Sequence, residues 1–357
     1  MKHSLARLFT LTLGAALFTG VSADATDIWK LRKTPADPGV LKRTFPTIGE
    51  VVRLDPELDQ IIAPGAKIEL LASGFTWSEG PVWLWRRHSI VFSDVPENVM
   101  YEWDYEHDLY TYRKPSGYTG PGKGQGSNGL TLDRQGRLVV AQHGDRRIAR
   151  LNADGSFTTL AEFYKMRRFN SPNDLVYHSN GDLYFTDPPY GLKGGNTSPD
   201  REIPFNGVYR LGKNGDITLL DEELTYPNGI ALSPDEETLY VAVSDPAKPV
   251  IFAYDVKADG TLDVKARRTF FDAAALAKAG APGLPDGLKV DIHGNVWTTG
   301  PGGVLVITPD GRHLGTISTG EPTANCAWGN DGSVLYITSN KYLVRIPTLT
   351  KGVGPGF

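Results

Sequence analysis

Pairs of short apolar segments, separated by turn residues, recur along the chain from residue 79 onward. Each pair begins at an oxygen-bearing side chain, continues as an apolar or β-branched strand, turns at Gly, Asp or Asn, and runs back as a second strand. The six copies begin at Glu79, Asn128, Asn173, Asn228, Asp286 and Asn325, with spacings of 49, 45, 55, 58 and 39 residues. Paired strands repeating every ~40–50 residues are typical of the blades of a β-propeller.

Hairpin turns and further strand pairs extend this pattern. Glycine-containing turns such as Ser179-Asn180-Gly181 and Asn330-Asp331-Gly332 separate the paired strands. Between the copies lie additional pairs, for example Val208–Leu211 with Ile217–Leu220. Only Ala273–Ala279 has the pattern of a helix. The sequence therefore predicts an all-β protein, a six-bladed β-propeller with four-stranded blades.

The composition agrees with this fold and excludes some functions. The 40 Gly and 25 Pro residues of the 357-residue chain suit many turns. The formal net charge of −4 is spread without a basic stripe, so the chain is not expected to bind nucleic acid. Cys326 is the single cysteine and excludes an intrachain disulfide; it is expected to be a buried structural thiol.

The N-terminus has the pattern of an export signal. Lys2 and Arg7 precede an apolar stretch over 8–18, and Val21-Ser22-Ala23 forms a small-x-small cleavage site. We expect residues 1–23 to be a signal peptide and the protein to be exported, either periplasmic or secreted. The alternative is a membrane anchor, but the apolar run is short for a span. The Pro-rich residues 24–66 are interpreted as an irregular lead-in that packs on the propeller, which covers 67–357.

The six blade-starting residues indicate a metal site. Innermost strands line the central channel of a propeller, so their first residues should converge on its axis, and all six carry a side-chain oxygen. One alternative is that Asn-Gly and Asp-Gly only form turns, although this does not explain Glu79. Converging carboxylates are costly without a cation, and a ligand set made only of oxygen favours Ca²⁺.

A second set of polar residues stands where the second strand of a blade ends. These residues are Asp94, His143, Asp187 and Asp245, and antiparallel pairing returns them to the face that holds the predicted metal site. They are expected to form a rim around a substrate pocket, where His143 could contact substrate, shuttle a proton or face a carboxylate. The alternatives are that Asp187 and Asp245 open turns before proline, and that His143 only packs under a loop.

Several strings resemble the gluconolactonase branch of the family that contains senescence marker protein (regucalcin). They are SEGPVW (78–83), SNGLTLD (127–133), RFNSPNDLV (168–176), YFTDPPYGL (184–192), YPNGIALSPDE (226–236), PDGLKVD (285–291) and ANCAWG (324–329). The resemblance implies a gluconolactonase-like lactone hydrolase that uses one divalent cation, most often Ca²⁺. Its implied metal ligands are Glu79, Asn173, Asn228 and Asp286.

The same resemblance assigns roles to other residues. It implies that Asn128 lies beside the metal and touches substrate, and that Arg168 and Asn170 bind substrate. The regucalcin-like members have a shorter RxN–D arrangement at this stretch. The inserted Ser171-Pro172-Asn173 sets this chain apart from them. Asn325 begins the last blade, where the family supplies no ligand, and is interpreted as a pocket residue or a structural cap.

The expected reaction is hydrolysis of a sugar lactone, foremost D-glucono-1,5-lactone to gluconate. The cation would polarise the lactone carbonyl, and Asp286 would act as the general base toward water. The chain has no GxSxG motif, which argues against a serine nucleophile. Alternatives are another sugar lactone, an organophosphate substrate on the same propeller, or a calcium-binding propeller without enzymatic activity. The sequence does not determine the oligomeric state.

Overall fold

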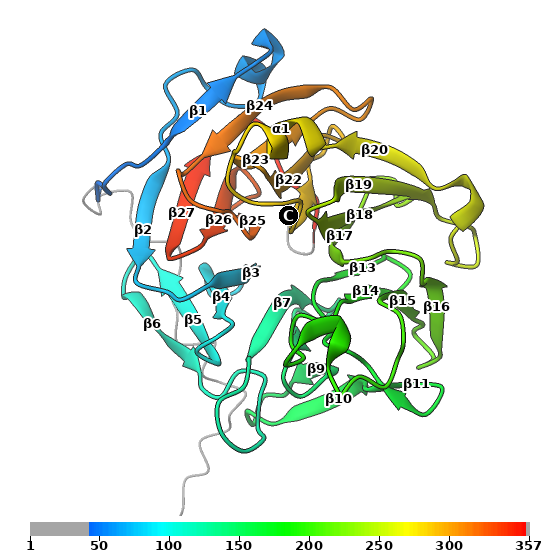
Figure 1. The fold of residues 1–357 in the computed structure, drawn as a ribbon. Coiled ribbons are helices and arrows are strands. Elements are labelled where there is room, and N and C mark those ends of the chain that lie inside the picture. Colours follow the sequence, from blue (N-terminus) through cyan, green and yellow to red (C-terminus); the bar gives the residue numbers. More distant parts are fainter. Residues whose placement is uncertain (1–42, 355–357) are drawn as a thin grey trace, which may run out of the picture. The chain divides into compact units, whose positions relative to one another are not determined.

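The computed structural model describes residues 43–354, which fold into a ring of β-sheets around a central axis (Figure 1). Within this range six sheets form the blades, each an antiparallel meander of four strands or more. The predicted six-bladed propeller is confirmed. The predicted signal peptide (1–23) and the first part of the lead-in lie outside the described residues. No helix within residues 43–354 is long and apolar enough to cross a membrane.

The first three blades follow one another along the chain. Blade one contains β3 (Ser78–Leu84), β4 (Ser89–Asp94), β5 (Val99–Asp104) and β6 (Asp108–Arg113). Blade two contains β7 (Ser127–Leu132), β8 (Leu138–Gln142), β9 (Arg147–Leu151) and β10 (Phe157–Ala161), and the small ribbon of β11 (Phe163–Tyr164) and β12 (Arg167–Arg168) follows it. Blade three contains β13 (Leu175–Tyr177), β14 (Leu183–Asp187), β15 (Gly207–Leu211) and β16 (Ile217–Asp221).

The next blades complete the ring. Blade four contains β17 (Pro227–Leu232), β18 (Thr238–Asp245), β19 (Lys248–Asp255) and β20 (Arg268–Asp272). Blade five contains β21 (Leu288–Val290), β22 (Val296–Gly300), β23 (Gly303–Ile307) and β24 (His313–Ser318). Blade six contains β25 (Asn325–Gly329), β26 (Val334–Ser339), β27 (Tyr342–Pro347) and, as its outer strand, β2 (Glu69–Ser73). The short helices are α1 (Ala274–Lys278), η2 (Pro56–Gln60), η3 (Gly195–Thr197) and η4 (Val264–Ala266).

The pairing of β2 with β27 closes the ring by joining an early strand to the last blade. Glu69 stands opposite Arg345 in this register, and their side chains form an ion pair with Nε to Oε2 at 2.7 Å. The described part of the predicted lead-in also contributes a strand, β1 (Glu50–Arg53), which pairs with β24 as a fifth strand of blade five. Residues ahead of the first blade are thereby built into two sheets.

Apolar side chains fill the spaces between neighbouring sheets. Strands such as β8 (LVVAQ) and β23 (GVLVI) are buried along their whole length because each faces a blade on both sides. The innermost strands β3, β7, β13, β17, β21 and β25 each contact the next one around the ring. They run in the same direction, so their first residues gather at one end of the channel and their last residues at the other.

Candidate functional site

One cavity of about 860 Å³ opens at the end of the channel where the inner strands begin. Its lining includes five of the six predicted axial residues: Glu79, Asn128, Asn173, Asn228 and Asp286. All except Asp286 are buried, and Asp286 is partly buried. The structure thus brings together the four predicted metal ligands and Asn128, although they lie as far apart in sequence as Glu79 and Asp286.

Glycines that follow the oxygen-bearing residues let the inner strands approach one another. A Cβ on Gly80 would lie 2.0 Å from the carbonyl oxygen of Asn128, and one on Gly229 would lie 2.1 Å from that of Asp286. Gly129 and Gly287 are similarly close to Asn173 and Asn325. The Asn-Gly and Asp-Gly pairs, for which a turn was the alternative explanation, are therefore contact points between blades that set the spacing of the site.

The two predicted carboxylate ligands repel each other. Burial and the nearby Asp174 carboxylate raise the pKa of Glu79 to about 7. Burial and the carboxylates of Glu79 and Asp174 raise the pKa of Asp286 well above its usual range. A positive charge placed between these groups would relieve the repulsion and stabilise their ionised forms.

Two amide oxygens at this cavity are free to serve as ligands. The Asn228 amide donates from Nδ2 to Ser244 Oγ at 2.8 Å, which leaves Oδ1 as the end of the amide that can bind a ligand. The oxygens Oδ1 of Asn228 and Asn128 are both buried without a hydrogen-bond partner. Unpartnered oxygens beside repelling carboxylates fit a hard, oxygen-preferring cation.

This ligand set relies on amides as well as carboxylates. Within residues 43–354, no three His, Cys, Asp or Glu side chains form a group that could hold a metal by themselves. The predicted set combines two carboxylates with the amides of Asn173 and Asn228, so the cation would depend on both kinds of oxygen.

His143 lies at the cavity and orients Asn128. Its Nδ1 is 2.8 Å from the carbonyl oxygen of Pro172, which can only accept, so Nδ1 carries the proton. Nε2 is therefore the acceptor for Asn128 Nδ2 at 3.0 Å. Burial lowers the pKa of His143 to about 4, which keeps the ring neutral and preserves this arrangement. Both ring nitrogens are engaged within the protein, so His143 acts on the cavity through Asn128.

Asn325 and Asp174 lie directly beneath the predicted ligands. Asn325 Nδ2 donates to Glu79 Oε2 at 3.2 Å and to Asp174 Oδ2 at 3.4 Å, while its Oδ1 accepts from its neighbouring backbone N–H. Asn325 thus presents its nitrogen to the carboxylates, in agreement with a supporting role. Asp174 stands at the position that glycine occupies in four sister blades. Asp174 belongs to the string 168–176, but the sequence gives no sign that its carboxylate lies close to Glu79.

Sequence reasoning missed the aromatic wall of the cavity. Tyr190 and Tyr226 both line it and stack with ring centroids 5.8 Å apart. The hydroxyl of Tyr190 is buried close to Ser244 and Asn228, and burial together with the Asp286 carboxylate raises the pKa of Tyr190. Tyr190 is thus a protonated phenol in the wall of the cavity. Both tyrosines lie in the strings 184–192 and 226–236, which could have pointed to them.

Two predicted substrate-binding residues lie away from this cavity. Arg168 lines a neighbouring cavity, where its guanidinium contacts Glu162 at 3.3 Å and the carbonyl oxygen of Asp145 at 2.8 Å. The Asn170 amide is fully buried and donates to the carbonyl oxygen of Phe205 at 2.8 Å. Neither lines the channel cavity, and their contact with substrate stays a prediction.

The acidic residues predicted for the rim instead hold loops in place. Asp94 accepts from the backbone N–H groups of Thr76 and Trp77 at 3.1 Å each. Asp187 accepts from those of Asn170 and Ser171 at 2.8 Å each, and Asp245 from that of Ala247. None of the three lines the channel cavity. The turn alternative holds for Asp245, and Asp187 anchors the segment that leads to Asn173.

Comparison with known proteins agrees with this architecture. Residues 77–341 match the family model described as SMP-30/Gluconolactonase/LRE-like region. The chain is 40% identical over 319 residues to the gluconolactonase of Zymomonas mobilis, covering 86% of this chain and 88% of that protein. It is 27% identical over 272 residues to pentonolactonase XacC of Haloferax volcanii, covering 73% of this chain and 80% of that protein.

Solved structures of gluconolactonases are also similar to this chain. The structure of XC5397 from Xanthomonas campestris, described as a gluconolactonase, superimposes with a TM-score of 0.75 at 32% identity. The match covers 88% of this chain and 99% of that one. Since the family model spans most of the chain and the relatives match it over most of their length, this chain belongs to the SMP-30/gluconolactonase/LRE-like family.

Proposed function

We propose that this protein is a metal-dependent hydrolase of sugar lactones, with D-glucono-1,5-lactone as the foremost substrate and Ca²⁺ as the cation. The observation that carries the proposal is the floor of the channel cavity, where two repelling carboxylates stand beside amide oxygens without partners. The family relationship, and the lactonases among its members, support the class of reaction.

Four side chains would hold the cation: Glu79, Asn173, Asn228 and Asp286. A divalent cation bound there would supply Lewis-acid stabilisation of the negative charge that develops on the lactone carbonyl oxygen. The cavity of about 860 Å³ accommodates a single sugar ring, and the stacked rings of Tyr190 and Tyr226 offer it an apolar face.

The chain's own residues would carry the proton transfers. Asp286 accepts a proton as water adds to the carbonyl carbon; the ring C–O bond then breaks and the released oxygen takes up a proton, which yields the hydroxy acid. Asn128, held by His143, presents Oδ1 as an acceptor for a sugar hydroxyl. The protonated hydroxyl of Tyr190 would be a further hydrogen-bond donor for substrate in this cavity.

The test is acid release from D-glucono-1,5-lactone in weak buffer, with and without Ca²⁺, corrected for spontaneous hydrolysis. The proposal expects turnover that EDTA removes and Ca²⁺ restores. A panel of xylono-, arabino- and galactonolactones and a phosphofluoridate compares the alternative substrates, and the pentonolactones matter because a relative bears the name pentonolactonase. Absence of turnover on every member of the panel, with Ca²⁺ bound, would favour a calcium-binding propeller without enzymatic activity.

We also propose that the protein is exported, on the strength of the signal-peptide pattern in residues 1–23. Expression of the full-length chain in a bacterium should give a mature protein in the periplasm or medium that begins at Asp24. Determination of the N-terminal sequence checks this, and a retained Met1 on a membrane-bound protein would favour the anchor alternative.

A further inference from the structure

The channel contains a cation of its own, Lys289, three residues after Asp286. Its Nζ donates to the carbonyl oxygen of Leu288 at 2.9 Å and lies 3.4 Å from Oδ1 of Asn325. The other end of the same Asn325 amide donates to Glu79 and Asp174. Asn325 thus connects the ammonium of Lys289 to two carboxylates, and the charge of Lys289 opposes the rise in the pKa of Glu79.

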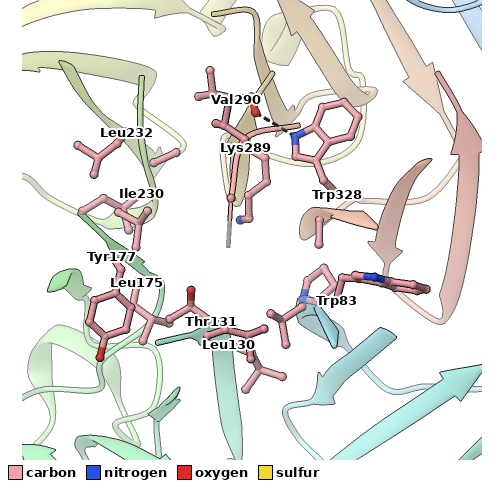
Figure 2. A pocket seen from close by; sticks show the side chains of 18 of the residues that line it. Trp83, Leu130, Thr131, Leu175, Tyr177, Ile230, Leu232, Lys289, Val290 and Trp328 are labelled. Atoms are coloured by element: carbon pink, nitrogen blue, oxygen red, sulfur yellow. Dashed lines mark hydrogen bonds between the residues drawn. The ribbon is translucent and has the colours of Figure 1, made fainter. Parts of the chain in front are cut away.

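Lys289 approaches the carboxylates from the end of the channel opposite the substrate cavity. It lines a second cavity of about 190 Å³, formed by the later residues of the inner strands. Figure 2 shows its side chain among apolar neighbours such as Trp83, Ile230 and Trp328. Because Lys289 is absent from the lining of the substrate cavity, it would influence the reaction through charge and not through contact with substrate.

The second cavity offers Lys289 little other compensation. Among the described residues that line this cavity, Glu236 is the one carboxylate, and it accepts from the backbone N–H of Ser179 at 2.8 Å and pairs with His178. A lysine placed in an apolar cavity is costly unless a negative charge is near. The carboxylates above Asn325 provide that charge, so the position of Lys289 is explained by the group of Glu79, Asp174 and Asp286.

We propose that Lys289 is a built-in counter-cation that sets the charge of the site for one divalent cation. When ionised, the three carboxylates carry three negative charges, and Lys289 reduces this to two, which a single divalent cation balances. Without Lys289 the channel would hold an uncompensated negative charge beneath the cation and bind it more tightly. This inference rests on the proposed cation-dependent function and adds a positioning residue that tunes cation affinity.

Titration of the EDTA-treated protein with Ca²⁺ in a calorimeter tests the proposal. The wild type should bind one Ca²⁺ per chain. Lys289→Met should lower the Kd by about tenfold or more, and Asp174→Asn should raise the Kd by about the same factor, because each changes the local charge by one unit in opposite directions. The double variant restores the net charge, so its Kd should return to within about threefold of the wild-type value.

Lys278→Met is the matched control, because Lys278 lies exposed on α1 and its loss should leave the Kd unchanged. A wild-type Kd in Lys289→Met would overturn the counter-cation and leave the lactonase untouched. Failure of the wild type to bind Ca²⁺ would instead overturn the cation-dependent function together with the charge balance. Should Lys289→Met not fold, Asp174→Asn and the double variant decide, since the proposal requires the double variant to bind Ca²⁺ more tightly than Asp174→Asn does, with a Kd close to the wild-type value.

Discussion

At the scale of single residues, neighbouring groups decide what each side chain at the channel floor can do. Asp286 and Glu79 are ordinary carboxyls whose pKa values rise because water is removed and like charges are close. Asn128 and Asn228 are ordinary amides, each turned by a partner that accepts from its nitrogen. A nearby positive charge would stabilise the ionised carboxylates, and the amide oxygens are additional groups that could contact a cation.

Removing the charge of Asp286 should stop the reaction. Asp286→Asn keeps the shape of the side chain but removes the group that accepts a proton from water, so kcat should fall by about a hundredfold or more. Asp245→Asn is the control, because Asp245 ends β18, lies outside the cavity and should leave kcat unchanged. Initial rates of acid release measure both, and an active Asp286→Asn enzyme would assign the base to another group.

Asn128 is expected to serve substrate and not the cation. Asn128→Ala should therefore retain bound Ca²⁺ while kcat/KM falls, because a sugar hydroxyl loses its acceptor. Metal content after gel filtration and steady-state kinetics are the two measurements. If Asn128→Ala loses its Ca²⁺ in proportion, then the free Oδ1 is a fifth ligand, and the division between ligands and substrate contacts is wrong.

His143 should act as a positioning residue through Asn128. His143→Leu removes the acceptor that holds Asn128 Nδ2, so kcat/KM should fall about tenfold, equivalent to roughly 1.4 kcal/mol. Because both residues act through one amide, the double variant His143→Leu/Asn128→Ala should be no slower than Asn128→Ala alone. Additive losses would show that His143 has a separate role, and a large loss of Tm with normal turnover of the folded enzyme would leave only the packing alternative.

At the scale of strands, the repeat could be read from the sequence because each blade reuses one pattern. Glu79, Asn128, Asn228 and Asp286 were found from their place at the start of a strand, and the strand explains their convergence. What the pattern could not show is what lies between blades. The pairing is irregular between Glu79 and Val82, between Ser127 and Leu130, and between Pro227 and Ile230, so the site residues stand outside the regular part of their strands.

Contacts made across the ring also escaped prediction. Asp174 and Lys289 sit within recognised strings, yet their importance depends on Asn325, which lies 151 residues beyond Asp174 in the sequence. Arg168 and Asn170 are assigned from a string whose spacing differs from that of the regucalcin-like relatives, and neither lines the channel cavity.

The close approach of inner strands makes the glycine after each ligand a sensitive position. In Gly229→Ala the new Cβ would lie 2.1 Å from the carbonyl oxygen of Asp286, so β17 or β21 must shift. We expect a loss of about 2 kcal/mol or more in the free energy of unfolding and a displaced Asp286 with little remaining activity. Gly65→Ala is the matched control, since its Cβ would meet nothing within 4 Å. Urea unfolding of both variants measures the difference, and equal stability would mean that the strands yield freely.

At the scale of the whole ring, the site joins blades that are distant in sequence. The four predicted ligands come from blades one, three, four and five, and the ring itself is closed by β2 beside β27. A cation held by these four blades would therefore act as a central crosslink, while the β2–β27 pairing acts at the periphery. The bound cation and the β2–β27 pairing would both stabilise the ring against separation of neighbouring blades.

Removal of the cation should consequently weaken the entire fold as well as the reaction. A ligand bound only to the native state at a hundred times its Kd adds about 2.7 kcal/mol to the free energy of unfolding. For a chain of this size, losing it should lower the Tm by about 5 °C or more, seen by calorimetry in EDTA and reversed by excess Ca²⁺. Glu79→Gln, which removes one of the two carboxylate ligands, should have the lower Tm already and respond little to EDTA. Full activity and an unchanged Tm after verified removal of metal would contradict the proposed role of the cation in both the reaction and the stability of the ring, because a cation that links the blades must stabilise the folded protein.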